Sequence, residues 1–283
     1  MPNNPSSKVI LITGTSSGFG LLTAARLSHK GHNVIATMRN LNKKDSLVSE
    51  VNKRGGQIDA LAVDVTNPES IKTAIEFIKE KYGYIDILIN NAGYGIGGFF
   101  EDLSDDEFRA QMETNFFGVL NMTRAAIPLM RHRPSAKIIN MSSTSGRFGT
   151  PALSAYVSSK FALEGFSESL HHELKQFGIT VILIEPGVYK TKIFEENGRY
   201  AKNFDNKESP YYPISQQLKK RTFDFLKDNY KDPEDVASLI EKIISQNNPS
   251  FRHIPDIESK VLLGLKQILP FRLFSWIVGK NMK

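Results

Sequence analysis

Short apolar runs alternate with helix-like segments from residue 8 to about residue 190, and this alternation constrains the fold more than any other feature. Continuous apolar runs rich in Val and Ile are typical of strands covered on both faces. The intervening segments, such as 70–78, carry apolar residues at helical spacing. The alternation predicts an α/β doubly wound parallel sheet. The predicted strands lie at 9–12, 34–36, 61–63, 85–89, 137–140 and 180–184.

No break in composition divides the chain, so we expect residues 1–283 to form one domain. The polar and aromatic segment at about 192–228 is expected to form a small helical substrate lid, and residues 255–283 a C-terminal helical appendage. The chain has no cysteine, which excludes disulfides, thiolate nucleophiles and Cys-ligated metal centres. We predict no metal. The net charge of +6 suits an anionic small molecule and is too small to indicate nucleic-acid binding.

Neither apolar end of the sequence has the pattern of a membrane or export segment. The run at 9–12 is far too short for the core of a signal peptide, and the stretch at 261–278 is interrupted by Lys266, Pro270 and Arg272. The sequence therefore predicts a cytoplasmic protein.

The first predicted strand runs directly into a Gly-rich turn and then a helix-prone segment. Such a turn lets backbone N–H groups approach a pyrophosphate, and the helix N-terminus adds a favourable dipole. The spacing Gly-x3-Gly-x-Gly departs from the Gly-x-Gly-x-x-Gly fingerprint, and a plain tight turn is the alternative. We predict the phosphate loop of a Rossmann-type sheet of about seven strands. The predicted cofactor-binding residues are Gly14, Thr15, Ser16, Ser17, Gly18, Phe19 and Gly20.

The ends of the next two predicted strands bear on the choice of cofactor. The second strand lacks the acid that normally accepts the ribose 2′-hydroxyl of NAD, and Arg39 stands beside that position. A guanidinium suits a 2′-phosphate, so we predict NADP(H); the alternative is that Arg39 is a solvated surface charge. Asp64 and Val65 follow the third strand, where a carboxylate could hold the adenine amino group. The alternative is that Asp64 caps the helix near Pro68.

Further motifs follow in a distinctive order: Asn90-Asn91-Ala92-Gly93, Asn115, Ser143 and Tyr156-x-x-x-Lys160. In order and spacing they resemble the short-chain dehydrogenase/reductase (SDR) family, over Lys8 to Thr191. Residues 34–40 and 255–283 resemble the branch that contains 17β-hydroxysteroid and retinol dehydrogenases. The resemblance implies an NADP(H)-dependent oxidoreductase that interconverts a hydrophobic carbonyl and its alcohol, of steroid, retinoid, long-chain or aromatic type. With NADPH, carbonyl reduction is the expected direction.

The residues themselves suit this chemistry. Tyr156 and Lys160 are four apart in a segment with few helix breakers, which places them one turn apart on one helix face. A free Tyr has a pKa of about 10, and an adjacent ammonium stabilises its phenolate, so we predict that Tyr156 is the acid/base. Ser143, thirteen residues earlier, follows a predicted strand and is expected to polarise the substrate oxygen. Ser142 is adjacent, but the family spacing selects Ser143.

The resemblance assigns roles to further residues. Asn115 is implied to help hold a water beside Lys160, and the alternative is a buried Asn satisfied by backbone. Lys160 also holds the nicotinamide ribose, and the backbone near Val188 and the Thr191 hydroxyl hold the carboxamide. Additional implied cofactor-binding residues are Asn91, Ala92 and Gly93, which border the adenosine ribose and phosphates, and the turn residues Pro186 and Gly187.

The expected lid is aromatic, which favours a lipophilic substrate over a sugar, although core packing is an equal alternative for these side chains. Residues 95–100 and Phe148 are expected to line the opposite wall. The expected lid aromatics are Phe194, Tyr200, Phe204, Tyr211, Tyr212, Phe223 and Phe225.

The tail at 259–283 combines basic and apolar residues without an acid. It is expected to pack on its own domain or on a partner subunit, or to make weak peripheral contact with a membrane. The resemblance implies a homodimer or homotetramer. Two rival functions stay open: a catalytically silent NADP-sensing protein that binds a partner, and a nucleotide-sugar epimerase or dehydratase.

Overall fold

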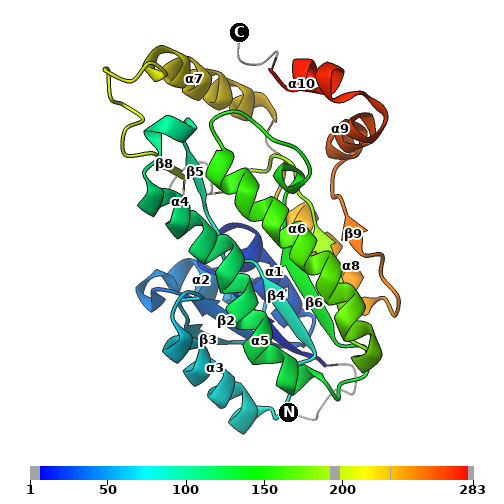
Figure 1. Cartoon of the computed structure of the whole chain (residues 1–283). Coiled ribbons are helices and arrows are strands. Elements are labelled where there is room, and N and C mark those ends of the chain that lie inside the picture. The colour runs from blue at the N-terminus through cyan, green and yellow to red at the C-terminus, as the bar shows by residue number, and fades with distance from the viewer. Residues whose placement is uncertain (1–6, 192–197, 230, 280–283) are drawn as a thin grey trace.

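The computed structural model describes residues 7–191, 198–229 and 231–279. Its centre is a sheet of seven described strands, all paired in parallel, in the order β3-β2-β1-β4-β6-β7-β9 (Figure 1). The chain moves outward from β1 to β3 and then continues on the other side of β1, which is a doubly wound Rossmann-type order. The predicted fold class is confirmed. The strands are β1 (Val9–Ile12), β2 (Asn33–Met38), β3 (Ile58–Ala62), β4 (Ile87–Asn90), β6 (Lys137–Met141), β7 (Thr180–Ile184) and β9 (Arg252–His253).

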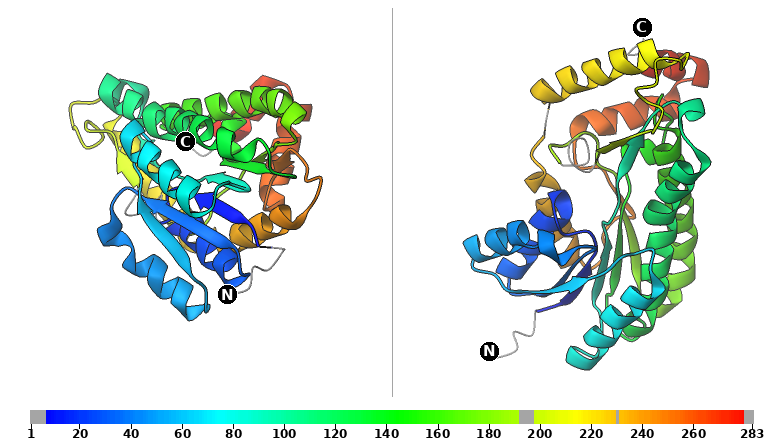
Figure 2. Two further views of the ribbon diagram at one scale, coloured as in Figure 1. Left: turned by 90° about the horizontal axis from the view of Figure 1, so that it is seen from below. Right: turned by 90° about the vertical axis from the view of Figure 1, so that its left-hand side faces the viewer.

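Helices cover both faces of the sheet because alternate residues of its strands bury apolar side chains on opposite faces. In β1, Ile10 and Ile12 join one core cluster and Val9 and Leu11 the other. Figure 2 shows the two helical layers on opposite sides of the strands. The first core includes side chains of α1 (Gly18–His29), α2 (Asp45–Lys53) and α8 (Glu234–Ser245), and the second those of α3 (Pro68–Lys81), α5 (Gly118–Met130) and α6 (Ser154–Leu174).

Two strands of the central sheet, β3 and β9, differ most from the sequence prediction. β3 begins at Ile58 rather than at residue 61. The polar residue Asp59 interrupts the apolar pattern but lies inside the strand, where its carboxylate accepts hydrogen bonds from Lys81 and Tyr82, both at 2.6 Å. Asp64 therefore lies two residues beyond the end of β3. β9 was not predicted, because a polar strand of two residues at the sheet edge has no apolar pattern.

The expected lid is not wholly helical. β8 (Gly198–Tyr200) pairs in parallel with β5 (Gly95–Gly97), and α7 (Tyr212–Asn229) follows. Residues 192–197, which include Phe194, lie outside the described residues, as does the side chain of Phe225. The assignment of residues 1–283 to one domain stays a prediction.

The predicted C-terminal appendage forms two helices, α9 (Ile257–Ile268) and α10 (Phe271–Gly279). Leu263 and Phe274 are buried with Phe148, so part of the tail packs on its own domain. None of the helices in the described ranges is long and apolar enough to cross a bilayer. The remaining elements are α4 (Asp105–Met112), a π-helical segment η3 (Glu113–Phe117), and the 3₁₀ turns η1 (Leu41–Lys43), η2 (Phe100–Asp102), η4 (Thr144–Gly146) and η5 (Lys175–Phe177).

Candidate active site

The Gly-rich turn joins β1 to α1 at the carboxyl edge of the sheet. Gly14 and Gly18 have φ of +70° and +57°, the left-handed region that favours glycine. A Cβ on Gly20 would lie 2.4 Å from both the Asn91 Nδ2 and the Gly14 oxygen. The first turn of α1 carries no acidic residue, so its positive end is uncompensated by the helix itself. This loop therefore has the backbone shape and polarity that a pyrophosphate requires.

The loop after β4 is locked against the Gly-rich turn. The Asn91 side-chain amide donates hydrogen bonds to the backbone oxygens of Thr13 and Gly14, both at 2.9 Å. The backbone N–H groups of Asn91 and Ala92 donate in turn to the Thr13 hydroxyl at 3.0 and 2.9 Å. Two sequence motifs about 77 residues apart thus form one surface, because β1 and β4 are neighbours in the sheet.

The residues expected at the adenosine end lie at the same edge. Arg39 is exposed and directly follows β2. Asp64 is half-buried, and its carboxylate accepts hydrogen bonds from the backbone N–H and hydroxyl of Thr66 at 2.9 and 2.7 Å. Asn67 caps α3, so the alternative that Asp64 caps this helix is wrong. Val65 is buried, and a Cβ on Gly118 would meet its Cγ2 at 2.5 Å.

The first turns of α6 carry Tyr156 and Lys160 behind the end of β6. Lys160 is buried, and its Nζ donates a 2.7 Å hydrogen bond to the backbone oxygen of Met141. The same Nζ lies 5.7 Å from the centroid of the Tyr156 ring. Burial lowers the pKa of Lys160 to about 8, and the nearby Glu164 carboxylate opposes this change.

Ser143 meets Tyr156 from the end of β6. Its hydroxyl accepts a hydrogen bond from the backbone N–H of Ser145 at 3.1 Å and also faces the phenol of Tyr156. Burial raises the pKa of Tyr156 above its usual value, and the Ser143 hydroxyl acts in the opposite direction. Burial therefore opposes the stabilisation of the Tyr156 phenolate that the adjacent Lys160 ammonium is expected to provide.

Ser142 belongs to a different environment. A Cβ on Gly146 would lie 2.9 Å from both the Ser142 Oγ and the Glu164 Cγ, so these two side chains converge behind η4. The neighbouring serines therefore face different partners: Ser143 faces Tyr156, and Ser142 faces Glu164.

Asn115 lies in η3, at a π-helical widening between α4 and α5. Its buried side chain donates to the Tyr94 backbone oxygen at 2.9 Å and accepts from the Tyr94 N–H at 3.1 Å. It also donates a 3.3 Å hydrogen bond to the hydroxyl of Ser159, the residue before Lys160. The contacts with Tyr94 match the alternative of an Asn satisfied by backbone, whereas the contact with Ser159 joins it to the helix of Tyr156.

The turn after β7 completes the edge. The Pro186 oxygen accepts a hydrogen bond from the Thr144 N–H at 3.1 Å, which links this turn to the loop of Ser143. A Cβ on Gly18 would lie 3.5 Å from the Thr191 Cβ, so Thr191 borders the phosphate loop. Val188 is half-buried between these two points. Pro186, Gly187, Val188 and Thr191 thus follow β7 as the sequence analysis expected.

Sequence reasoning missed a buried charged cluster beneath this edge. Glu164 and Glu185 are both buried and share Arg252, at 3.1 and 2.9 Å. Arg147 also pairs with Glu185 at 3.2 Å. Burial and the neighbouring Glu185 raise the pKa of Glu164 to about 7. The available signal was that Glu164 stands four residues after Lys160 on one helix face.

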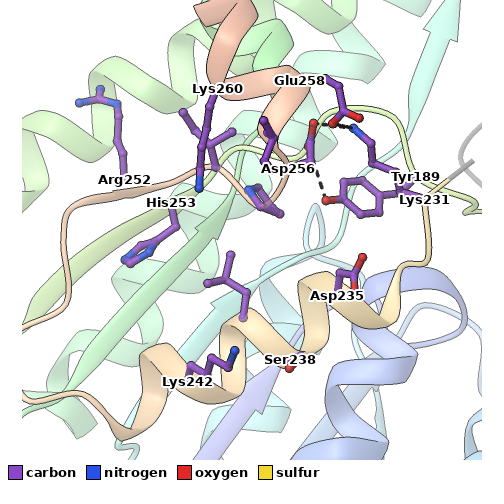
Figure 3. Close-up of a pocket in the computed structure, with 14 residues that line it drawn as sticks. Tyr189, Lys231, Asp235, Ser238, Lys242, Arg252, His253, Asp256, Glu258 and Lys260 are labelled. Carbon is purple, nitrogen blue, oxygen red and sulfur yellow. Dashed lines mark hydrogen bonds and ion pairs between the residues drawn. The ribbon is translucent and has the colours of Figure 1, made fainter. Parts of the chain in front are cut away.

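Arg252 also lines a pocket of about 550 Å³, whose lining includes none of Ser143, Tyr156 and Lys160 (Figure 3). The pocket lies between α8 and the start of α9, where Tyr189 and Lys231 both point toward Asp256. Lys231 pairs with Asp256 at 2.6 Å, and Asp256 accepts a 3.3 Å hydrogen bond from the Gly187 N–H. Asp256, at the start of α9, therefore connects Lys231 to the turn after β7.

A family model for short chain dehydrogenases matches residues 8–202. The chain belongs to the short-chain dehydrogenase family. As a short-chain dehydrogenase it is an oxidoreductase, and the predicted family is confirmed.

Curated relatives of this short-chain dehydrogenase cover nearly its whole length. It is 41% identical to the uncharacterized oxidoreductase YusZ of Bacillus subtilis, over 98% of this chain and 97% of that protein. It is 40% identical to a 3-ketodihydrosphingosine reductase of Bacteroides thetaiotaomicron, over 98% and 95%. Human retinol dehydrogenase 8 is 35% identical over 92% and 85%, in agreement with the retinol dehydrogenase-like branch.

Solved structures match the fold of this short-chain dehydrogenase. A short-chain dehydrogenase from Streptomyces avermitilis superposes with a TM-score of 0.80 at 32% identity, covering 98% of both chains.

Two other solved structures of similar fold contain different cofactors. A Burkholderia phymatum protein in complex with NAD has a TM-score of 0.79 at 23% identity, covering 92% of this chain and 93% of that one. Actinorhodin polyketide ketoreductase with NADPH has a TM-score of 0.73 at 27% identity, covering 88% and 95%.

Proposed function

We propose that this short-chain dehydrogenase uses NADP(H) to interconvert a hydrophobic carbonyl and its alcohol, with reduction as the working direction. One observation carries the proposal: Tyr156 faces the Ser143 hydroxyl, and the Lys160 ammonium lies 5.7 Å from the centroid of the Tyr156 ring. This arrangement suits a proton donor whose conjugate base is stabilised by a cation.

The residues at the carboxyl edge of the sheet fit a bound dinucleotide. The positive-φ glycines and the acid-free first turn of α1 suit the pyrophosphate. Arg39 would pair with a 2′-phosphate, and Asp64 and Val65 would border the adenine. Asn91, Ala92 and Gly93 would border the ribose. When bound, the cofactor supplies the hydride.

The chain's own groups would handle the proton and the substrate oxygen. The Ser143 hydroxyl donates a hydrogen bond to the carbonyl oxygen, which favours negative charge on it. Tyr156 gives its proton to that oxygen. Lys160, protonated below pH about 8, stabilises the resulting phenolate. Asn115 would position a water that returns a proton from solvent by way of Lys160.

The lid and its facing loop support a lipophilic substrate. Tyr200 and Phe204 contact each other with ring centroids 4.4 Å apart, and Tyr211 stacks on Phe99 at 4.6 Å. Phe148 is instead buried against Phe274. The names of two relatives, a 3-ketodihydrosphingosine reductase and a retinol dehydrogenase, agree with a hydrophobic ketone or alcohol.

Assembly as a homodimer or homotetramer is part of the proposal. Phe117 in η3 and Phe161 in α6 are each 43% exposed, on the elements that carry Asn115 and Tyr156. Exposed aromatic side chains of this kind are enriched at interfaces between subunits. Light scattering of wild type and Phe161→Ser would test it, with a loss of the oligomer expected in the variant. A wild-type monomer would remove this part of the proposal.

The test of the reaction is oxidation of NADPH and NADH with steroid ketones, retinal, aromatic aldehydes and medium-chain ketones. Turnover should favour NADPH and fall by orders of magnitude in Tyr156→Phe, while NADPH binding stays near wild type. Turnover that survives Tyr156→Phe would refute the proposed acid. Tight NADPH binding without turnover of any substrate, in either direction, would favour a cofactor-sensing protein.

A further inference from the structure

The two C-terminal helices expose a stripe of large apolar side chains. On α9 the exposed large apolar residues repeat at intervals of three and four, which places them on one helix face. Ile257 and Ile268, at the two ends of this stripe, are 74% and 80% exposed. The buried Leu263 lies off the stripe and packs into the domain. The stripe is Ile257, Val261, Leu265 and Ile268.

α10 contacts α9 and exposes three further large apolar side chains after Pro270. Phe271 is 82% and Trp276 is 62% exposed, and Leu273 is exposed as well, whereas Phe274 is buried. Exposed apolar side chains that stand singly are ordinary, but a continuous patch marks an interaction site. We call the three α10 residues and the α9 stripe together the C-terminal apolar face.

The charges on the two C-terminal helices are mostly positive. From Ser259 to Gly279 the described helices carry Lys260, Lys266 and Arg272 and no acidic residue. Lys266 is engaged with the backbone oxygen of Arg147. Lys260 and Arg272 are exposed, and Lys260 extends beside the pocket in Figure 3. The preceding acid, Glu258, is paired with Lys231 at 2.7 Å.

The sign of the charge favours one occupant over another. In a two-fold contact between copies, the same surface meets itself, so Arg272 and Lys260 would approach cations with no acid from 259–279 to pair with. An anionic bilayer supplies both an apolar interior for the side chains and negative charge for the cations. A Trp at the boundary between water and hydrocarbon is also typical of membrane surfaces.

We propose that α9 and α10 lie on the surface of an anionic lipid bilayer, with the C-terminal apolar face inserted at the headgroup boundary. Figures 1 and 2 show α7, α9 and α10 together at the end of the molecule opposite the N-terminus. α7 lies within the expected lid segment at about 192–228, so docking brings this helix close to a source of lipophilic substrate. The proposal goes beyond the proposed reaction and does not depend on turnover.

Trp276 is the only tryptophan in the chain, so its emission reports directly on this face. The full chain is mixed with vesicles of phosphatidylcholine alone or with phosphatidylglycerol and separated by flotation. We expect flotation with the anionic vesicles and a blue shift of the Trp276 emission. Lys260→Gln and Arg272→Gln should each weaken partitioning about fivefold.

The double variant Ile268→Ser, Phe271→Ser should lose flotation. The matched control is Phe177→Ser, an exposed aromatic in η5 outside both C-terminal helices, which should float as wild type. Quenching of wild-type Trp276 by brominated phospholipid needs no substitution and keeps the test valid if a variant fails to fold.

Three results would overturn the proposal: no flotation of folded wild type with anionic vesicles, no quenching by brominated lipid, or unchanged flotation of the double variant. A blue shift that depends on protein concentration without vesicles, and disappears in the double variant, would instead assign the face to a second copy. NADPH turnover serves as an independent measure, because its loss alone leaves flotation unaffected.

Discussion

Lys160 and Glu164 lie one turn apart on α6, and both side chains are buried behind the carboxyl end of β6. Glu164 raises the pKa of Lys160 against the larger effect of burial, which lowers it to about 8. Burial and the carboxylate beneath the proposed active site therefore together determine the pH at which the lysine loses its charge.

Glu164→Gln should shift the alkaline limit of activity. Activity in the wild type should fall above pH about 8, because neutral Lys160 no longer stabilises the Tyr156 phenolate. Removal of the carboxylate lowers the pKa of Lys160 further, so the limit should move to lower pH. The measurement is kcat/KM against pH, and Glu168→Gln, an exposed partner of Arg252 one turn further along α6, is the control. An unchanged pH profile in Glu164→Gln would show that this carboxylate does not influence the charge of Lys160 during the reaction.

The two adjacent serines should differ in effect. Ser143→Ala removes the hydroxyl that faces Tyr156 and should lower kcat about 10²-fold or more, as loss of a donor to a developing oxyanion does. Ser142→Ala removes a buried hydroxyl beside Glu164 and should leave kcat within a few-fold. Steady-state kinetics under saturating NADPH provide the comparison. Equal losses would show that the serine facing Tyr156 has no special role.

Arg39→Ala should change cofactor preference. If the guanidinium pairs with the 2′-phosphate, its loss should weaken NADPH binding by about tenfold or more and leave NADH nearly unchanged. Titration calorimetry with both cofactors measures this. Lys30→Ala is the matched control, because Lys30 is an exposed cation at the C-terminal end of α1, away from the Gly-rich turn at its N-terminal end. A loss shared equally by both cofactors would mean that Arg39 does not distinguish them.

Gly20→Ala should damage the phosphate loop and the fold together. Its Cβ would lie 2.4 Å from Asn91 Nδ2 and from the Gly14 oxygen, so the turn after β1 or the loop after β4 must shift. Thermal unfolding and NADPH affinity should both decrease. Gly165→Ala, in the middle of α6 with nothing within 4 Å of the added Cβ, should instead stabilise the protein by up to about 1 kcal/mol. Wild-type stability and affinity in Gly20→Ala would show that the loop tolerates the shift.

The sequence determined the local features of this protein. Apolar runs predicted β1, β4, β6 and β7 because buried parallel strands must be apolar on both faces. The four-residue interval between Tyr156 and Lys160 predicted one helix face because the helical period is local. The motif order predicted the family. β9 was missed, since a polar edge strand depends on its neighbour and not on its own composition.

Only the tertiary structure decided which distant residues meet. It joined Asn91 to Gly14 and Asn115 to Ser159, and it separated Ser143 from Ser142 by the partners that each faces. It also buried Glu164 with Glu185 around Arg252, and it left one face of α9 and α10 exposed. Burial and long-range contact arise from the packing of elements far apart in sequence. No spacing or composition along a single segment contains that information.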